Sequence, residues 1–133
     1  MKKTFLNLSS LAFGIFLIAG TISSCSKTNP NAQFLGTYTG NYTTGAGTSP
    51  DTVVISAGSS STAVVLLEKK NAITLNGTVS SNTITIPSQN ITIAGGSYPT
   101  SGTGALSTNT LSVNLTTVVS GASLTSNFTG TKQ

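Results

Sequence analysis

Few residues in this chain can carry chemistry. The sequence has one cysteine, Cys25, two acidic residues, Asp51 and Glu68, and no histidine. Without histidine, Ser-His-Asp and Cys-His arrangements are impossible, and metal sites built on His and Cys are excluded. No glycine-rich phosphate loop lies between a strand and a helix. We therefore predict no catalytic residue, no metal site and no cofactor.

Asp51 and Glu68 form the one acidic pair that acid–base chemistry would need. Asp51 opens one expected strand and Glu68 closes the next, so a hairpin would bring their carboxyl groups together. The interpretation that we favour is structural. Both would be solvated charges at the end of a hairpin, with Glu68 balancing Lys69 or Lys70. On this interpretation the protein is not an enzyme.

Tyr38, Tyr42 and Tyr98 are the only tyrosines, and tryptophan is absent. As functional residues they would line the mouth of a barrel and stack on a sugar or an apolar ligand. As structural residues, Tyr38 and Tyr42 would be core aromatics whose hydroxyl groups reach the rim. We favour the structural interpretation, and all three stay candidate rim residues for a ligand. Tyr98 is expected in a loop, beside Pro99.

The cysteine follows directly on an apolar leader. Two lysines after Met1 precede an almost continuous apolar run over residues 6–20. This run has the length of the apolar part of a secretory signal and is short for a membrane-spanning helix. A thiol without a partner in the chain is unusual in an exported protein. We expect residues 1–24 to be a helical export signal that ends just before Cys25.

The residues around the cysteine, Ile-Ser-Ser-Cys at 22–25, resemble the lipobox of bacterial lipoproteins. The resemblance assigns Ile22, Ser23 and Ser24 to recognition by the signal peptidase, and Cys25 to lipidation. It implies a covalent diacylglycerol and an N-acyl chain on Cys25. Each buried CH₂ contributes about 0.8 kcal/mol, so several acyl chains would anchor the protein in membrane lipid.

The low charge limits the possible partners. Only 6% of residues are charged, arginine is absent, and no basic run is longer than Lys69-Lys70. Nucleic-acid binding needs a clustered basic footprint, so it is excluded. The formal net charge of +4 includes Lys2 and Lys3, which would leave with the signal.

After residue 33, short runs of alternating apolar and Ser/Thr residues are separated by turn residues, and no helical period has caps. We expect a flexible lipidated tether at 25–33 and one all-β domain at 34–133, an antiparallel meander of about eight or nine short strands. Loops are expected at 43–50 and 95–102, and a break at 87–89. Closure into a barrel would remove exposed edges, with a β-sandwich as the alternative.

Alternation of faces along each strand predicts the core. Both faces are apolar at 64–67, and there we place residues 65 and 67 inward. The expected core is Val53, Ile55, Val65, Leu67, Ile73, Leu75, Val79, Ile84, Ile86, Ile91, Ile93, Leu106, Leu111, Val113, Leu115, Leu124 and Phe128, with the aromatics of the first strand. The first and last strands both contain Phe-x-Gly, so we expect them to pair at the seam.

The domain opens with Phe-x-Gly-x-Tyr-x-Gly at 34–40 and ends with Phe-x-Gly-x-Lys at 128–132. In this it resembles the small lipocalin-like, calycin-type lipoproteins of Gram-negative bacteria. Lipocalins usually carry Gly-x-Trp near the start, where this chain has Tyr38 two residues after Gly36. The resemblance implies a non-enzymatic, lipid-anchored protein of the cell envelope, in the outer membrane, whose barrel binds a small apolar ligand or has a filled core.

The alternative is an envelope interaction module, such as an adhesin, an inhibitor or an assembly accessory. It would bind an envelope protein through an exposed strand edge or through the expected loops at 43–50 and 95–102, and it would have no small-molecule ligand.

Overall fold

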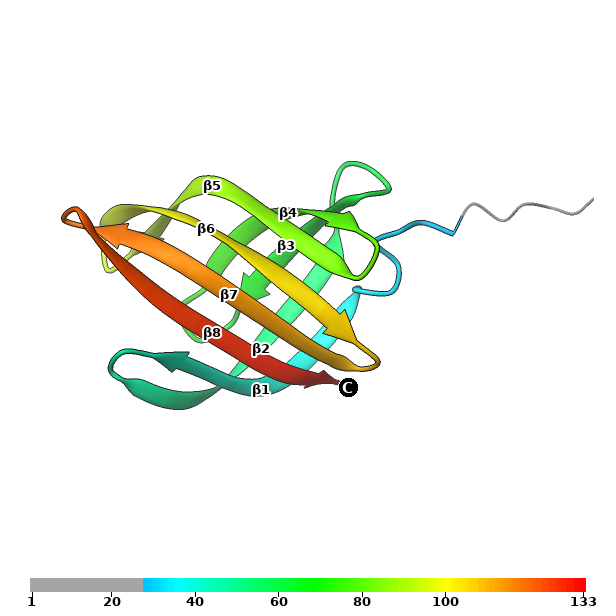
Figure 1. The fold of residues 1–133 in the computed structure, drawn as a ribbon, viewed down its shortest axis with the longest axis horizontal. Helices are drawn as coiled ribbons and strands as arrows, with labels where there is room; N and C mark the ends of the chain where they lie inside the picture. Colours follow the sequence, from blue (N-terminus) through cyan, green and yellow to red (C-terminus); the bar gives the residue numbers. More distant parts are fainter. Residues whose placement is uncertain (1–27) are drawn as a thin grey trace, which may run out of the picture.

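The computed structural model describes residues 28–133, which form a closed barrel of eight antiparallel strands (Figure 1). The strands are β1 Gly36–Thr44, β2 Gly47–Ala57, β3 Ala63–Glu68, β4 Ile73–Ser80, β5 Thr83–Ile93, β6 Gly96–Ser107, β7 Thr110–Val119 and β8 Ala122–Lys132. Each strand pairs with the next, and β8 pairs with β1. The expected all-β meander is confirmed as a barrel, and the sandwich alternative is wrong.

The export signal and the lipobox, with Cys25, lie outside the described residues. Within residues 28–133 there is no helix that is long and apolar enough to span a membrane.

Two glycines allow the first and last strands to close the barrel. β1 pairs with β8 along most of its length, and Gly40 lies opposite Gly130. A Cβ atom on Gly40 would collide with the backbone of Thr129 and Gly130. Glycine therefore permits a close backbone approach and a sharp bend at this seam. The expected pairing of the first and last strands is confirmed.

Apolar side chains fill one end of the barrel, which we call the closed end and which carries the β2–β3, β4–β5 and β6–β7 turns. Phe34 lies just before β1 and is fully buried, and the Tyr38 hydroxyl donates to its carbonyl oxygen (2.8 Å). The buried apolar residues are Phe34, Tyr38, Val53, Ile55, Val64, Leu66, Ile73, Leu75, Val79, Ile84, Ile86, Ile91, Leu106, Leu111, Val113, Leu115 and Phe128.

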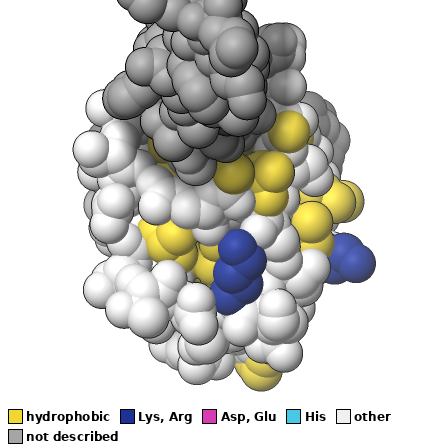
Figure 2. Space-filling view, turned by 90° about the vertical axis from the view of Figure 1, so that its right-hand side faces the viewer, with side chains coloured by type: hydrophobic (Ala, Val, Ile, Leu, Met, Phe, Trp, Pro, Cys, Tyr) yellow, Lys and Arg dark blue, Asp and Glu magenta, His cyan; other side chains and the backbone are white. Residues whose placement is uncertain are grey.

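The chain enters the barrel at the closed end and packs against it. Asn31 is buried, and its side-chain amide donates to the carbonyl oxygens of Ala63 (3.0 Å) and Ser60 (3.4 Å). The Gln33 side chain donates to the carbonyl oxygen of Ser81. Asn31 and Gln33, which we assigned to the tether, thus lie against the β2–β3 and β4–β5 turns. Figure 2 faces this end and shows lysine and apolar side chains but no acidic side chain among the described residues.

The expected loops and the expected break are mostly strand. Residues 87–89 lie within β5, where a bulge between Ile86 and Gln89 keeps both halves paired with β6. Residues 43–50 belong to β1 and β2 except for a tight turn at 45–46, and residues 96–102 lie in β6. Proline ends a strand only where its missing N–H is needed, and a bulge removes that need at Pro87.

The phase expected for β3 is also wrong. Val64 and Leu66 are buried, with 1% and 3% of their surface exposed, whereas Val65 and Leu67 are only partly buried. A shift of one residue turns every side chain of a strand to the other face. Because all four residues are apolar, alternation carries no signal there.

Candidate functional site

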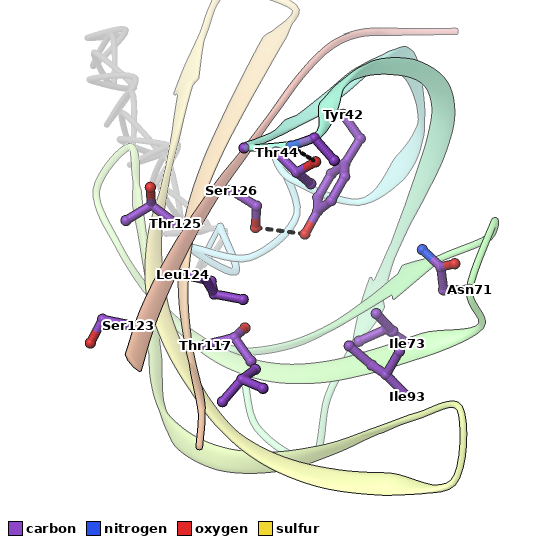
Figure 3. A pocket seen from close by; sticks show the side chains of 13 residues that line it. Tyr42, Thr44, Asn71, Ile73, Ile93, Thr117, Ser123, Leu124, Thr125 and Ser126 are labelled. Carbon is purple, nitrogen blue, oxygen red and sulfur yellow. Dashed lines mark hydrogen bonds between the residues drawn. The ribbon is translucent and has the colours of Figure 1, made fainter. Parts of the chain in front are cut away.

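The other end of the barrel is open and holds a cavity of about 620 Å³, which we call the cup (Figure 3). It lies at the end that carries the β1–β2, β3–β4, β5–β6 and β7–β8 turns. Gly45 and Ala46 of the β1–β2 turn and Asn71 of the β3–β4 turn line it, with residues of the adjoining strands. Small-molecule sites in proteins usually enclose about 300 to 1,000 Å³. The cup therefore has the size of a small-molecule site.

Apolar side chains form much of the wall of the cup. Figure 3 shows Ile73 and Ile93 on one side, with Leu124 on the other. Leu124 and Ile93 were expected in the core, but 55% and 36% of their surfaces are exposed. The reason is their level in the barrel: both lie beside the open end, where no further side chains cover them. Together with Val118 they are the exposed large hydrophobic residues of the described chain.

Hydroxyl groups lie beside this apolar wall. The Tyr42 hydroxyl and the Ser126 Oγ atom form a hydrogen bond of 2.6 Å across the β1–β8 seam (Figure 3). Thr117 shares a hydrogen bond of 2.9 Å with Thr100 on β6. Burial raises the pKa of Tyr42, so this hydroxyl stays protonated at neutral pH. An apolar cavity with a few fixed polar groups is the usual form of a ligand site.

The structure separates the three tyrosines that we singled out. Tyr42 lines the cup. Tyr38 is fully buried in the core, as its structural interpretation predicts. Tyr98 is not in a loop: it lies within β6 and is partly buried, and its ring packs over Gly96. Of the three, Tyr42 alone belongs to the wall of the cup.

Asp51 and Glu68 lie beneath the cup, and each has only 7% of its surface exposed. Glu68 on β3 is opposite Val53 on β2, and Asp51 is the preceding inward residue of β2. The expected proximity of the two carboxyl groups is confirmed, and the expectation that they are solvated is wrong. No ion pair links Glu68 to Lys69 or Lys70 within residues 28–133, and the Lys70 ammonium group donates to Ser49 Oγ instead (2.8 Å).

The two carboxyl groups bind the backbone of the β3–β4 turn. Asp51 Oδ1 accepts from the N–H groups of Thr52 (2.6 Å) and Lys70 (3.3 Å). Glu68 accepts from the backbone N–H of Asn71 (3.1 Å) and from its side-chain amide (3.2 Å). Asp51 Oδ2 is buried and has no hydrogen-bond partner among these donors.

Burial, together with a smaller contribution from the hydrogen bond to Asp51, raises the pKa of the Glu68 carboxyl group to about 7. Two adjacent carboxylates cannot both ionise without strong repulsion. A protonated Glu68 donates its hydroxyl hydrogen to Asp51, so the pair shares one proton. This hydrogen is lost when Glu68 ionises, and the fixed donors of the protein do not replace it.

Tyr42 and Asn71 lie between Glu68 and the cup. Glu68 and Tyr42 line a void of about 20 Å³, and Tyr42 also lines the cup. Asn71, which donates to Glu68, lines the cup as well. The pair is therefore directly beneath the floor of the cup. No group of three or more His, Cys, Asp or Glu side chains in the described part of the chain could hold a metal ion.

The sequence contains a signal for this burial that we did not use. Glu68 has the same phase as Val64 and Leu66 in a six-residue strand, so burial of either apolar residue directs the carboxyl group inward.

Comparison of the chain with family models, curated proteins and solved structures found no match.

Proposed function

We propose that this is a lipid-anchored protein of the cell envelope whose cup binds a small ligand with an apolar body, without catalysing a reaction. The observation that carries the proposal is the open cavity of about 620 Å³ with Leu124 and Ile93 exposed in its wall. Exposed apolar groups in a concave surface favour a ligand, because binding removes them from water.

The filled half of the barrel supports this division of roles. The 17 buried apolar residues form one core cluster, and this cluster includes Ile73 at the wall of the cup. The barrel therefore has its own stabilising core, and the cup is not needed to stabilise the fold. On this proposal the molecule has both a filled core and a ligand site, which the resemblance to lipocalin-like lipoproteins gave as alternatives.

The anchoring part of the proposal comes from the lipobox resemblance at Cys25. The first residue that packs on the closed end, Asn31, is six residues beyond it. Six residues span about 20 Å at most. A lipid on Cys25 would thus hold the closed end near the membrane, which we propose to be the Gram-negative outer membrane, with the cup facing away.

Two observations favour binding over the other functions that we considered. A hydrolase that used Asp51 and Glu68 would need a substrate beside them, and the adjoining void of about 20 Å³ has room for roughly one water molecule. An interaction module acting through a strand edge would need a free edge, and the described barrel is closed.

The experiment is a titration of lipid-stripped protein with a fluorescent fatty acid. We expect saturable binding with one site, and an affinity about tenfold lower in Leu124→Asn, because a Leu side chain contributes about 1.5 kcal/mol or more when a ligand buries it. Val118→Asn is the matched control, since Val118 is also exposed but does not line the cup. Absence of saturable binding, or equal losses in both variants, would remove the proposed function.

A further inference from the structure

The wall of the cup offers polar groups without charge. Thirteen residues of the described chain line the cup, and none of them is acidic or basic. The lysines among residues 28–133 lie elsewhere. The Lys132 ammonium group donates to the Gln33 carbonyl oxygen at the closed end (3.1 Å), and the Lys70 ammonium group donates to Ser49. An anionic head group inside the cup would therefore have no cationic partner in its wall.

The acidic pair does not supply an ionic contact for a cation in the cup. Asp51 and Glu68 do not line the cup, and they share a proton with each other. The pair still carries negative charge, and this charge acts on the floor. Burial is the main cause of the raised pKa of Tyr42, and the charges of Glu68 and Asp51 add to it. A carboxylate beside Tyr42 would be repelled, and an ammonium group would contact neutral oxygens only.

The hydroxyl groups of Tyr42 and Ser126 have a hydrogen that no protein acceptor uses. Together they carry two hydrogens and form one hydrogen bond with each other (2.6 Å). Neither oxygen makes another hydrogen bond within residues 28–133. Either hydroxyl group can be the donor of the existing bond. In both cases the other hydroxyl group keeps its hydrogen for a molecule in the cup, which both residues line.

Thr117 offers the complementary group, an acceptor. The Thr100 hydroxyl donates to the Tyr98 carbonyl oxygen (3.4 Å), so Thr117 supplies the hydrogen of its bond with Thr100 (2.9 Å). The oxygen of Thr117, which lines the cup, can then accept a hydrogen bond. Thr117 lies two residues beyond Leu115, which is opposite Ser126, and such diagonal neighbours in a sheet are about 7 to 8 Å apart. Donor and acceptor are thus within reach of one small head group.

We propose that the cup selects an uncharged amphiphile with a hydroxyl head group, which lies between the Tyr42–Ser126 pair and Thr117. This inference rests on the proposed binding function of the cup, whose apolar wall would hold the rest of the molecule. A hydroxyl group donates and accepts, whereas a carboxylate only accepts and an ammonium group only donates. Figure 3 shows the Tyr42–Ser126 hydrogen bond apart from Ile73 and Ile93, so the head group and the apolar body have separate places.

The test compares hexanol, hexanoate and hexylamine, which share a six-carbon body and differ in the head group. Equilibrium dialysis measures their binding to the full-length protein as the cell produces it, in neutral phosphatidylcholine nanodiscs, with empty nanodiscs as the blank. At pH 7 we expect hexanol to bind about tenfold more tightly than either ion, because an unpaired charge loses more than a hydroxyl group when it leaves water.

A double variant tests the assignment to the hydroxyl pair. Tyr42→Phe with Ser126→Ala removes both hydroxyl groups and keeps the apolar wall. Hexanol affinity should fall about fivefold, which corresponds to roughly 1 kcal/mol of hydrogen bonding. The affinity for 1-chlorohexane, which has no hydroxyl group, should stay the same and so show that the cup is intact.

Thr43→Val with Thr48→Val is the matched control. It also removes a pair of hydrogen-bonded hydroxyl groups (3.0 Å) from β1 and β2, but neither residue lines the cup. Hexanol affinity should be unchanged in this variant.

The inference and the proposed function can fail separately. Equal affinities of hexanol, hexanoate and hexylamine, or tighter binding of either ion, would overturn the selectivity and leave the cup in place. Equal hexanol affinities in the two double variants would overturn the assignment to Tyr42 and Ser126. Absence of hexanol binding to a protein that binds the fluorescent fatty acid would overturn this inference alone, and absence of both would remove the proposed function as well.

Discussion

At the scale of single residues, the carboxyl groups of Asp51 and Glu68 are buried in the barrel without a lysine partner, and Glu68 has a raised pKa there. Asp51 accepts two backbone N–H groups through one oxygen, and Glu68 accepts from Asn71. These bonds fix both side chains at the β3–β4 turn. The energy of the pair then depends on the proton that Glu68 holds, which links the stability of the fold to pH.

We expect the free energy of unfolding to fall as pH rises from about 5 to about 8. Glu68 has a pKa of about 7 in the folded protein, above its ordinary value of 4.5. Between these values the folded chain keeps a proton that the unfolded chain has lost, so stability decreases with pH. The contribution is complete below the ordinary pKa and is lost above about pH 7. Urea unfolding at both pH values should show a loss of roughly 1 to 3 kcal/mol.

Glu68→Gln is the control for this prediction. Its side chain is neutral throughout, so most of the pH dependence between 5 and 8 should disappear. A variant that lost as much stability over this range as the unmodified protein would assign the effect to another group.

The sequence predicted the meeting of Asp51 and Glu68 but not their burial. Strand ends of one hairpin lie side by side whatever their surroundings, so their proximity follows from the order of the strands. Burial was missed because carboxylates are almost always exposed. Glu68 lies on the opposite face of β3 from Val65 and Leu67, so placing those two residues inward also placed Glu68 in solvent. In the structure Glu68 faces inward, and Val65 and Leu67 face outward.

At the scale of elements, closure depends on local devices in a few strands. β4 and β5 pair at only three positions, from Thr78 opposite Thr85 to Ser80 opposite Thr83. Beyond them, the Gln89 side chain accepts the N–H of Asn76 (2.9 Å) and donates to its carbonyl oxygen (2.8 Å). The Gln89 side-chain amide thus makes the two hydrogen bonds to Asn76 that the backbone of a paired β5 residue would make. Such a contact depends on where the bulge lies, which alternation does not reveal.

Gly40→Ala tests the device at the seam. The new Cβ atom would meet the backbone of Thr129 and Gly130, which cannot turn aside as a side chain can. We expect a loss of about 1 to 3 kcal/mol in the free energy of unfolding, measured by urea denaturation, because overpacking forces the strands apart. Gly45→Ala is the control, since nothing lies within 4 Å of its Cβ position. Equal stability of the two variants would show that the seam tolerates the methyl group.

At the scale of the whole molecule, the two ends of the barrel have different roles. The closed end contains Phe34 and receives the chain, and the open end holds the cup. Barrel closure could be predicted from the Phe-x-Gly strands at both termini. The cup could not, because Leu124 and Ile93 alternate in the sequence like core residues. An inward-facing residue is covered by core side chains near the closed end but borders the cup near the open end. Which of the two applies depends on how far each strand extends beyond the packed core.

The direction of the cup relative to the membrane can be measured with single fluorescent labels. Ser59→Cys lies at the closed end and Ala122→Cys at the open end, and both positions are exposed. Strands of 11 residues rise about 3.3 Å per residue, so the ends are far enough apart for a quencher to separate them.

In vesicles with a quencher on the lipid headgroups, we expect strong quenching of the label at residue 59 and weak quenching at residue 122. The unmodified chain should take no thiol label, because the proposed lipid occupies the sulfur of Cys25. Equal quenching at both positions would contradict a cup that faces away from the membrane. Labelling of Cys25 would show a free thiol and contradict the lipid anchor. The proposed orientation, which depends on that anchor, would then lose its support.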